Sequence, residues 1–172
     1  MMKPIYVEVA IGKNNELGNK GQLLWHLKDD LRLFKERTMN NIVIMGRKTY
    51  DSIKSSLEGR TVIVVTRTPE NVILKKKNDL AVTSLENALL FTGLLSGNSI
   101  HIAGGGEIYK AFFELDLPHV LNLTRVNTVD NIECDTFFEG VDYTKYTSSS
   151  SFSATRGCYT PPEFEFFTYV RY

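Results

Sequence analysis

The sequence contains few cysteines and histidines, no excess of charge and no long apolar run, and each lack excludes a class of protein. Its 172 residues include 2 cysteines and 3 histidines. Cys134 and Cys158 have no metal-binding spacing, so we expect free thiols. Lysine plus arginine and aspartate plus glutamate number 20 each, so no overall field draws the chain to nucleic acid or to a membrane. An anionic ligand must therefore be held by local charges.

No segment has the character of a targeting or membrane sequence. The residues from Met1 to Pro4 lack the apolar centre of a secretory signal, and no apolar run approaches the length of a transmembrane helix. We therefore expect a cytoplasmic protein. An apolar fraction of 42% and a charged fraction of 23% are ordinary for a globular protein, and residues 1–172 suffice for one domain with its own core.

Short apolar runs alternate with helical patterns over the first two-thirds of the chain. We expect strands at residues 5–11, 42–45, 62–65, 80–83, 100–103 and 120–126, and helices at 27–39, 47–53, 85–95 (with Ser84 as N-cap) and 107–115. A final strand pair is expected at 146–155 and 164–172 with a turn at 157–162, a loop at 12–21 and a solvated turn at 75–79. This order predicts a single-domain α/β fold. Its central β-sheet is mostly parallel with an antiparallel C-terminal edge, and helices cover both faces.

Consecutive glycines, Gly104, Gly105 and Gly106, lie between a predicted strand and a predicted helix. In a mostly parallel sheet, ligands bind outside the carboxyl ends of the strands. Glycine at such an end lets backbone N–H groups and the helix N-terminus approach a phosphate. The spacing is not the full dinucleotide-binding fingerprint, so a tight turn that binds nothing is the alternative.

Arginines follow neighbouring predicted strands. Arg47 comes directly after one strand and Arg67 after the next, and Thr49 and Thr66 place hydroxyl groups close by. Guanidinium groups beside backbone donors suit a phosphate-bearing cofactor, and a 2′-phosphate explains more than one arginine. Each arginine taken alone is better explained as a surface charge. Together with the glycine turn, the pair favours a phosphorylated dinucleotide.

The helix predicted from Leu27 carries one carboxylate at the edge of its apolar face. Leu27, Leu31 and Phe34 recur at the spacing of a helix face, and Asp30 borders that face. A carboxylate beside apolar groups is costly to desolvate unless it is paired, and a ligand with adjacent N–H donors is such a partner. The alternative is a solvated acid that the helix dipole favours in the first turn.

No pairing of a nucleophile with a base is visible in the sequence. His26, His101 and His119 are scattered without metal-ligand spacing and are interpreted as packed or surface side chains, so we expect no metal. One carboxylate together with a dinucleotide site favours hydride transfer, because the cofactor then carries the difficult chemistry.

Segments in order over nearly the whole chain resemble the dihydrofolate reductase family. The most specific are Trp25 followed by Asp30, and the run MGRKT that begins at Met45. The other matching segments are residues 10, 17–18, 24, 34–35, 43–53, 59–60, 65–67, 103–109, 123–124 and 135–138.

The resemblance implies reduction of 7,8-dihydrofolate to 5,6,7,8-tetrahydrofolate with NADPH. A hydride would reach pterin C6 and a proton would reach N5. The catalytic residues it implies are Asp30, Thr124 and Trp25. Asp30 would pair with the pterin 2-amino group and N3 and act electrostatically, while water delivers the proton. The partner is thus a small molecule, and we expect a monomer.

The resemblance also implies binding residues. Those for the substrate are Glu8, Val9, Ala10, Leu31, Phe34, Ile53, Leu57, Arg60 and Ala103, with Arg60 on the substrate's glutamate. Those for NADPH are Ala10, Ile11, Leu17, Gly18, Gly46, Arg47, Lys48, Thr49, Thr66, Arg67, Gly104, Gly105, Gly106, Glu107, Ile108 and Tyr109. A cis peptide is implied between Gly104 and Gly105, and a mobile lid at residues 12–24.

Some residues depart from the family's pattern. Leu24 and Glu58 stand where proline is common, which would loosen the lid and shift Arg60. Glu8 stands where the family usually has an apolar residue whose backbone carbonyl faces the pterin amino group. Its carboxylate would either raise the pKa of Asp30 by like-charge repulsion or turn outward, leaving only backbone in the site. We take the outward orientation as the expectation.

Other functions stay open at this point. The pyrimidine reductase of riboflavin synthesis shares this fold and cofactor, but Trp25, Asp30 and Arg60 argue against it. The other alternative is a catalytically inactive paralogue that binds NADPH or folate. The intact Asp30 argues against that function, whereas Glu8 keeps it open.

Overall fold

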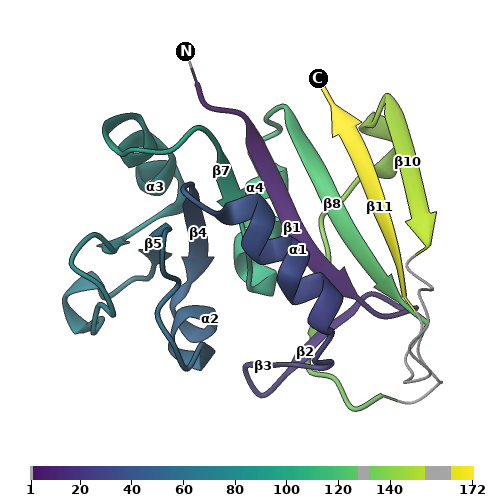
Figure 1. The fold of residues 1–172 in the computed structure, drawn as a ribbon, viewed down its shortest axis with the longest axis horizontal. Coiled ribbons are helices and arrows are strands. Elements are labelled where there is room, and N and C mark those ends of the chain that lie inside the picture. Colours follow the sequence, from purple (N-terminus) through teal and green to yellow (C-terminus); the bar gives the residue numbers. More distant parts are fainter. Residues whose placement is uncertain (1, 128–131, 154–163) are drawn as a thin grey trace.

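The computed structural model describes residues 2–127, 132–153 and 164–172 (Figure 1). Its strands are β1 (Ile5–Ile11), β2 (Glu16–Asn19), β3 (Gln22–Leu23), β4 (Ile42–Gly46), β5 (Thr61–Val65), β6 (Leu80–Val82), β7 (Ile100–Ile102), β8 (His119–Val126), β9 (Thr136–Phe137), β10 (Ser148–Ser153) and β11 (Phe164–Arg171). Its helices are α1 (Lys28–Thr38), α2 (Arg47–Ser52), α3 (Leu85–Phe91) and α4 (Gly106–Glu114), with 3₁₀ turns η1 (Pro69–Asn71), η2 (Thr92–Leu94) and η3 (Tyr143–Lys145). The strands and helices predicted from the sequence are present, with small shifts at their ends.

The central sheet has 8 strands in the order β10-β11-β8-β1-β7-β4-β5-β6. β1 pairs in parallel with both β7 and β8, and parallel pairing continues from β7 through β4 and β5 to β6. At the other edge, β11 is antiparallel to β8, and β10 is antiparallel to β11. The predicted fold class is confirmed.

Alternate residues of the strands pack against helices on opposite faces of the sheet. In β4, Ile42 and Ile44 join the core covered by α3 and α4, whereas Val43 and Met45 join the core beside α1 and α2. Burial on both faces explains why such a strand is a continuous apolar run rather than an alternating one. Figure 1 shows α1 lying across the front of β1, so the side chains of both elements meet between them.

A small second sheet in the order β3-β2-β9 was not predicted. Its first strands fall in and just after the segment expected to be a loop. Glu16, in β2, is 7% exposed, and its carboxylate accepts a hydrogen bond from the Asn14 backbone N–H at 2.8 Å. The Asn15 carbonyl accepts from the Phe138 N–H at 2.9 Å. Backbone pairing with a distant segment thus orders this region, and no local pattern signals such pairing.

Other expectations concern single residues and absences. Ser84 caps α3 as predicted, accepting from the Asn87 N–H at 3.2 Å. Cys134 is a free thiol, while Cys158 and the predicted turn at 157–162 lie outside the described residues. Within the described part of the chain, no helix is long and apolar enough to cross a membrane. Nor does that part gather 3 or more His, Cys, Asp or Glu side chains as a metal site would need.

Candidate active site

Asp30 lies in the first turn of α1 and reaches the sheet beneath it. Its Oδ1 accepts a hydrogen bond from Thr124 Oγ1 at 2.5 Å. Thr124 stands opposite Ala10 in the ladder between β8 and β1 and is 2% exposed. The structure thus brings Asp30, Thr124 and Ala10 together. The alternative of a solvated first-turn acid does not hold, because the carboxylate is half-buried and paired.

The environment of Asp30 changes its proton affinity. Burial raises the pKa of the Asp30 carboxyl above its ordinary value. The hydrogen bond from Thr124 lowers this pKa, the negative charge of Glu8 raises it, and the positive charge of Arg37 lowers it. The carboxyl therefore keeps its proton to a higher pH than a solvated aspartate does, until a ligand supplies donors to its ionised form.

Apolar side chains of α1 and of the core beside it are only half-buried. Phe34, Ile53, Leu57 and Ala103 pack against the core formed by β4, β5 and α2. Leu31, one turn before Phe34 in α1, is 36% exposed. Leu31 and Phe34 thus leave partly exposed apolar surface on the helix that carries the half-buried Asp30, and a flat, partly polar ring would cover such surface.

Val9 and Ile11 are placed differently from the other predicted site residues. Their side chains alternate with Ala10 along β1 and pack in the opposite core, where they are 7% and 0% exposed. Only their main-chain groups are available on the face of β1 that lies under α1. We therefore expect any ligand contact of these residues to use the backbone.

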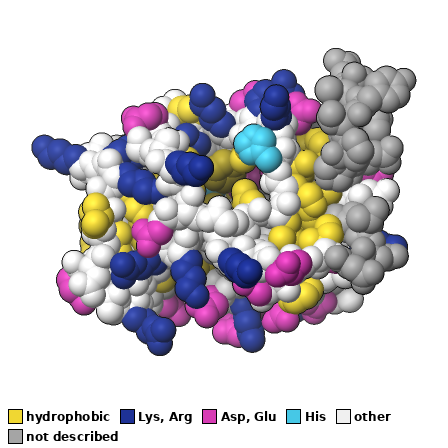
Figure 2. All heavy atoms as spheres, turned by 90° about the horizontal axis from the view of Figure 1, so that it is seen from below, with side chains coloured by type: hydrophobic (Ala, Val, Ile, Leu, Met, Phe, Trp, Pro, Cys, Tyr) yellow, Lys and Arg dark blue, Asp and Glu magenta, His cyan; other side chains and the backbone are white. Residues whose placement is uncertain are grey.

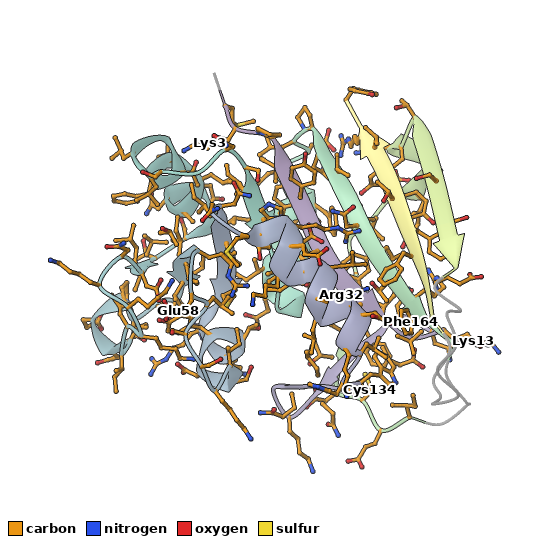
Figure 3. The ribbon with its side chains drawn as sticks, viewed as in Figure 1. Lys3, Lys13, Arg32, Glu58, Cys134 and Phe164 are labelled. Atoms are coloured by element: carbon orange, nitrogen blue, oxygen red, sulfur yellow. The ribbon has the colours of Figure 1, made fainter. Side chains whose placement is uncertain are left out.

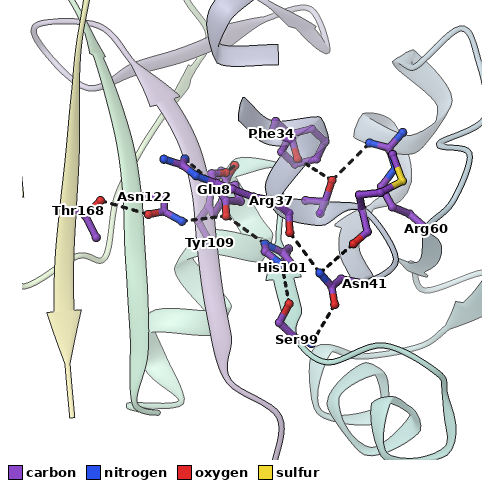
Figure 4. Close-up of polar contacts among 12 residues, drawn as sticks. Glu8, Phe34, Arg37, Asn41, Arg60, Ser99, His101, Tyr109, Asn122 and Thr168 are labelled. Atoms are coloured by element: carbon purple, nitrogen blue, oxygen red, sulfur yellow. Dashed lines mark hydrogen bonds and ion pairs between the residues drawn. The ribbon is translucent and has the colours of Figure 1, made fainter. Parts of the chain in front are cut away.

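Glu8 is buried beneath α1, so its expected outward orientation is wrong. The residue is 7% exposed and shares the face of β1 with Ala10, which α1 covers. Its Oε1 lies 3.0 Å from His101 Nδ1 and accepts from Asn122 Nδ2 at 2.9 Å. Its Oε2 accepts from Arg37 Nη1 at 3.2 Å, as Figure 4 shows. These bonds compensate the desolvation of the carboxylate and explain why it stays inside.

The groups around Glu8 are themselves held. Ser99 Oγ lies 2.9 Å from His101 Nε2, and the Tyr109 hydroxyl donates to the Glu8 backbone carbonyl at 2.7 Å. Tyr109 is 4% exposed, and burial raises its pKa well above the ordinary value. A Cβ atom added to Gly104 would stand 3.2 Å from this hydroxyl. Tyr109 therefore connects the glycine turn to the Glu8 end of the site.

Two helices begin beside each other where the neighbouring strands β4 and β7 end. Gly46 is the N-cap of α2 and Gly105 that of α4, and neither makes a side-chain capping bond. The Gly46 N–H donates to the Gly104 carbonyl at 2.8 Å, and a cis peptide joins Gly104 to Gly105, as the resemblance implies. A Cβ on Gly105 would stand 3.2 Å from Thr49 Oγ1, and one on Gly46 would stand 3.2 Å from Ile108. Glycine at these positions therefore lets the two helix starts lie close together. The first N–H groups of a helix have no partner within it and are available to an anionic ligand.

Basic and hydroxyl side chains lie beside these helix starts. Arg47 Nη1 donates to Thr68 Oγ1 at 3.3 Å, and Thr66 Oγ1 accepts from the Thr68 N–H at 3.3 Å. Among the residues predicted to bind NADPH, the exposed ones are Lys48, Arg67 and Glu107. Figure 2 looks onto the end of the sheet toward which β1 and β4 run, and it shows lysine and arginine side chains spread over that face. The donor set thus fits the phosphates of a dinucleotide, although Glu107 opposes them.

The segment that precedes α1 lies against the same region. Leu17 is 8% exposed, and a Cβ on Gly106 would stand 3.7 Å from its Cδ2. Gly18 is tied to β9 through the pairing of β2. Trp25 is half-buried, and a Cβ on Gly12 would stand 3.1 Å from its ring. The structure therefore places Leu17 and Gly18 beside the glycine turn and Trp25 over Gly12.

Lys75 belongs to the turn expected to be solvated, but it binds the loop after α2. Its Nζ donates to the backbone carbonyls of Tyr50 and Ile53 and lies 4.6 Å from the centre of the Tyr50 ring. Its own backbone N–H donates to the Tyr50 hydroxyl at 2.6 Å. The expectation of a solvated turn is wrong here, because an ammonium group supplies donors for carbonyls that leave a helix end.

Lys76 holds the other end of the same loop. Its Nζ donates to the carbonyl of Leu57 at 2.8 Å and to that of Arg60, and lies 3.5 Å from Asp79 Oδ1. The side chain is only 16% exposed. Arg60 in turn donates from Nη1 to Thr38 Oγ1 at 3.4 Å, which ties the loop to the end of α1. The segment with Leu57 and Arg60 is therefore fixed between Lys76 and α1.

Residues around Glu8 and in this lysine pair were not predicted for the site. They are Arg37, His101, Asn122, Lys75 and Lys76. A signal existed for part of the set, because Glu8 and His101 interrupt apolar runs of strands that become neighbours. Arg37 and the lysines occur in ordinary polar patterns, which give no such signal.

Comparisons with known proteins identify the family to which the chain is similar. The family model described as dihydrofolate reductase matches residues 4–171. Dihydrofolate reductase of Haemophilus influenzae is 35% identical over 141 residues, covering 80% of this chain and 80% of the relative. Bifunctional dihydrofolate reductase-thymidylate synthase 1 of Arabidopsis thaliana is 33% identical over 173 residues, covering 90% of this chain. The chain spans 33% of the length of that relative.

A solved structure is also similar over nearly the full length. It is a dihydrofolate reductase from Enterococcus faecalis in complex with NADP(H) and RAB-propyl. The TM-score is 0.84 at 26% sequence identity, with 99% of this chain and 97% of that chain covered.

Proposed function

The chain belongs to the dihydrofolate reductase family, and on this premise we propose that it reduces 7,8-dihydrofolate to 5,6,7,8-tetrahydrofolate with NADPH. The observation that carries the proposal is the half-buried pair of Asp30 and Thr124, which lies beneath α1 beside half-exposed apolar side chains. A pterin offers adjacent N–H donors on a flat ring, which is the chemistry that this pair accepts.

The residues of this chain bind, orient and shield the reactants. NADPH supplies the hydride when it is bound. Asp30 accepts hydrogen bonds from the pterin 2-amino group and from ring N3. These bonds orient the ring, and the carboxylate favours positive charge on it as the reaction proceeds. Thr124 holds the carboxylate in place. Leu17 and Trp25, from the segment over the glycine turn, exclude bulk water from the reacting face.

The cofactor's phosphates are assigned to the helix starts and the nearby cations. The N–H groups at the start of α4 meet the pyrophosphate, and glycine is needed there for a close approach. Arg47, Lys48, Thr49, Thr66 and Arg67 surround the adenosine end. Guanidinium groups that recognise a 2′-phosphate would make NADPH the preferred cofactor over NADH.

Oxidation of NADPH by the purified protein tests this function. We expect oxidation to depend on dihydrofolate and to be faster with NADPH than with NADH. Binding of NADPH without turnover would contradict the proposal and favour an inactive paralogue, or a reductase of another heterocycle. The cytoplasmic location and the monomeric state are further proposals, which rest on the sequence.

Arg67→Gln is expected to raise the KM for NADPH about 10- to 100-fold and to leave the KM for NADH nearly unchanged, because a hydrogen bond to a charged phosphate contributes about 1.5–3 kcal/mol. Initial rates at varied cofactor concentration measure both constants. Arg32→Gln is the control, since Arg32 lies on the surface of α1 (Figure 3). Its guanidinium pairs with Asp29 at 3.2 Å. An equal loss with both cofactors would assign Arg67 a role other than recognition of the 2′-phosphate.

Lys76→Met is expected to raise the KM for dihydrofolate about 5- to 30-fold with little change in the KM for NADPH. The lysine fixes the carbonyls of Leu57 and Arg60, so its loss loosens the loop that meets the substrate tail by about 1–2 kcal/mol. Lys77→Met, at the exposed neighbouring position, is the matched control. Unchanged KM values in both variants would show that the loop keeps its position without this bond.

A further inference from the structure

We propose that Glu8 is a positioning residue whose buried negative charge, balanced by Arg37, sets the pH range over which the Asp30 site works. The proposal rests on the function proposed above. Neither residue needs to contact the substrate for this role, since each acts on Asp30 through the low-dielectric space between α1 and the sheet.

Register places the three charged groups in one layer. Glu8 pairs with Asn122 and Ala10 pairs with Thr124 across β1 and β8, and Thr124 binds Asp30. Positions two apart on a strand are about 6.8 Å apart on the same face, so Glu8 lies one such step from the Asp30 contact. Along α1, Arg37 follows Asp30 by seven residues, about 10.5 Å along the axis and near the same helix face. The Glu8 carboxylate thus lies close to Arg37 and within the range of a strong interaction with Asp30.

The network prevents Glu8 from turning away. Arg37, Asn122 and His101 contact its carboxylate from α1, β8 and β7 at 3.2, 2.9 and 3.0 Å. The Tyr109 hydroxyl, from α4, binds the Glu8 backbone carbonyl. The Tyr6 ring stacks on His101, with the ring centres 5.1 Å apart. A side chain held from each neighbouring element keeps a fixed position, and so its charge acts on Asp30 in a fixed direction.

The titratable groups that face this layer are few in the described residues. Asp30 and Arg37 come from α1, Glu8 and Tyr6 from β1, His101 from β7 and Tyr109 from α4. The contacting groups on β8 are neutral, namely Asn122 and Thr124. Of these groups, Glu8 and Arg37 carry the charges that act on Asp30, in opposite directions.

The reaction makes this balance consequential. Reduction of dihydrofolate takes up a proton, so the positively charged form of the reacting complex must be populated, and turnover falls as pH rises. A negative charge near the site favours the protonated form and moves this fall to higher pH. The guanidinium of Arg37 acts in the opposite direction. Loss of the Glu8 charge should therefore move the alkaline limb of the pH profile to lower pH. Loss of the Arg37 charge should move it to higher pH.

Variants in which a neutral side chain replaces each charged one test the proposal. In Glu8→Gln the alkaline limb of single-turnover hydride transfer should move down by about 1–2 pH units, and in Arg37→Gln up by a similar amount, as expected for charges about 6–12 Å apart at an effective dielectric constant near 20. The alkaline limb of the double variant should lie between those of the single variants. Limbs that coincide with wild type, or that move in the same direction in both variants, would overturn the proposal. A purely structural network predicts such a shared direction, because either change breaks the same bond.

A direct titration separates this inference from the proposed function. The Asp30 carboxyl is followed by ¹³C NMR of aspartate-labelled protein, assigned with Asp30→Asn, in the absence of any substrate. We expect its pKa to fall in Glu8→Gln and to rise in Arg37→Gln. If the wild-type protein does not reduce dihydrofolate but these shifts occur, the proposed function fails while the electrostatic role stands. If turnover is present but Asp30 titrates alike in all variants, the role assigned to Glu8 fails. Unfolding midpoints confirm that each variant is folded when it is measured.

Discussion

Asp30→Asn is expected to lower the turnover of dihydrofolate by about 10²–10³-fold while NADPH binding stays close to wild type, because the variant loses the charge that favours a cationic pterin in the transition state. Asparagine keeps the shape and one acceptor for the Thr124 hydroxyl. It also introduces N–H groups that face the pterin's own donors. Single-turnover hydride transfer measures the loss, and quenching of Trp25 fluorescence on titration with NADPH measures binding.

Stability distinguishes this loss from unfolding. Burial raises the pKa of Asp30 in the folded protein. The stability that Asp30 contributes is therefore fully present below its unfolded pKa and is lost as pH rises through the folded pKa. Asparagine carries no such ionisation, so the variant should be at least as stable as wild type at neutral pH, and the difference should vanish toward acid pH. Near-native turnover at neutral pH would remove Asp30 from the role assigned here, and a variant that is less stable at neutral pH would contradict the burial argument.

The central fold could be predicted because its signals are local. The runs at 42–45 and 62–65 are continuous and apolar, and the structure buries both on two faces of a parallel sheet. Ser84 likewise indicates the start of α3, because serine is a favoured N-cap residue. The second sheet could not be predicted, since Glu16 and Asn15 are polar residues in a glycine-rich segment. Their order comes from pairing with residues 136–138, more than 110 positions away in the chain.

The candidate site divides along the same line. Asp30, the glycine turn and the arginines stand out because each is unusual for its local pattern. The inward orientation of the Glu8 side chain cannot be recognised in this way, because it depends on donors from three other elements. A buried carboxylate is expensive alone and acceptable with such donors. The contacts of Lys75 and Lys76 could not be predicted for a related reason, since their carbonyl partners belong to a loop that the sequence does not place beside them.

A second large effect is expected on stability rather than on the chemical step. Asp79 is 1% exposed, and its carboxylate joins three elements of the fold. Oδ2 accepts from the Tyr50 hydroxyl at 2.8 Å, and Oδ1 accepts from the Val62 N–H at 3.1 Å and lies 3.5 Å from Lys76 Nζ. Burial and the neighbouring Asp79 raise the pKa of Tyr50 to about 12, so its hydroxyl stays a donor over the physiological range.

Asp79→Ala is expected to lower the free energy of unfolding by about 3–5 kcal/mol, because it leaves a buried hydroxyl, a backbone N–H and an ammonium group without their shared acceptor. Urea denaturation at neutral pH measures the change. Asp79→Asn retains part of the acceptor capacity and should fall between the alanine variant and wild type. Asp116→Asn is the control: this exposed aspartate pairs with Lys145 and Arg171, each at 2.7 Å, but solvent screens such pairs, and asparagine tolerates the left-handed backbone at this position (φ 57°), so we expect little change. Equal stability of Asp79→Ala and Asp116→Asn would show that the Asp79 contacts are replaced by water. Removal of a buried aspartate would then cost no more stability than removal of an exposed one with as many partners. That result would contradict the reasoning applied above to Glu8.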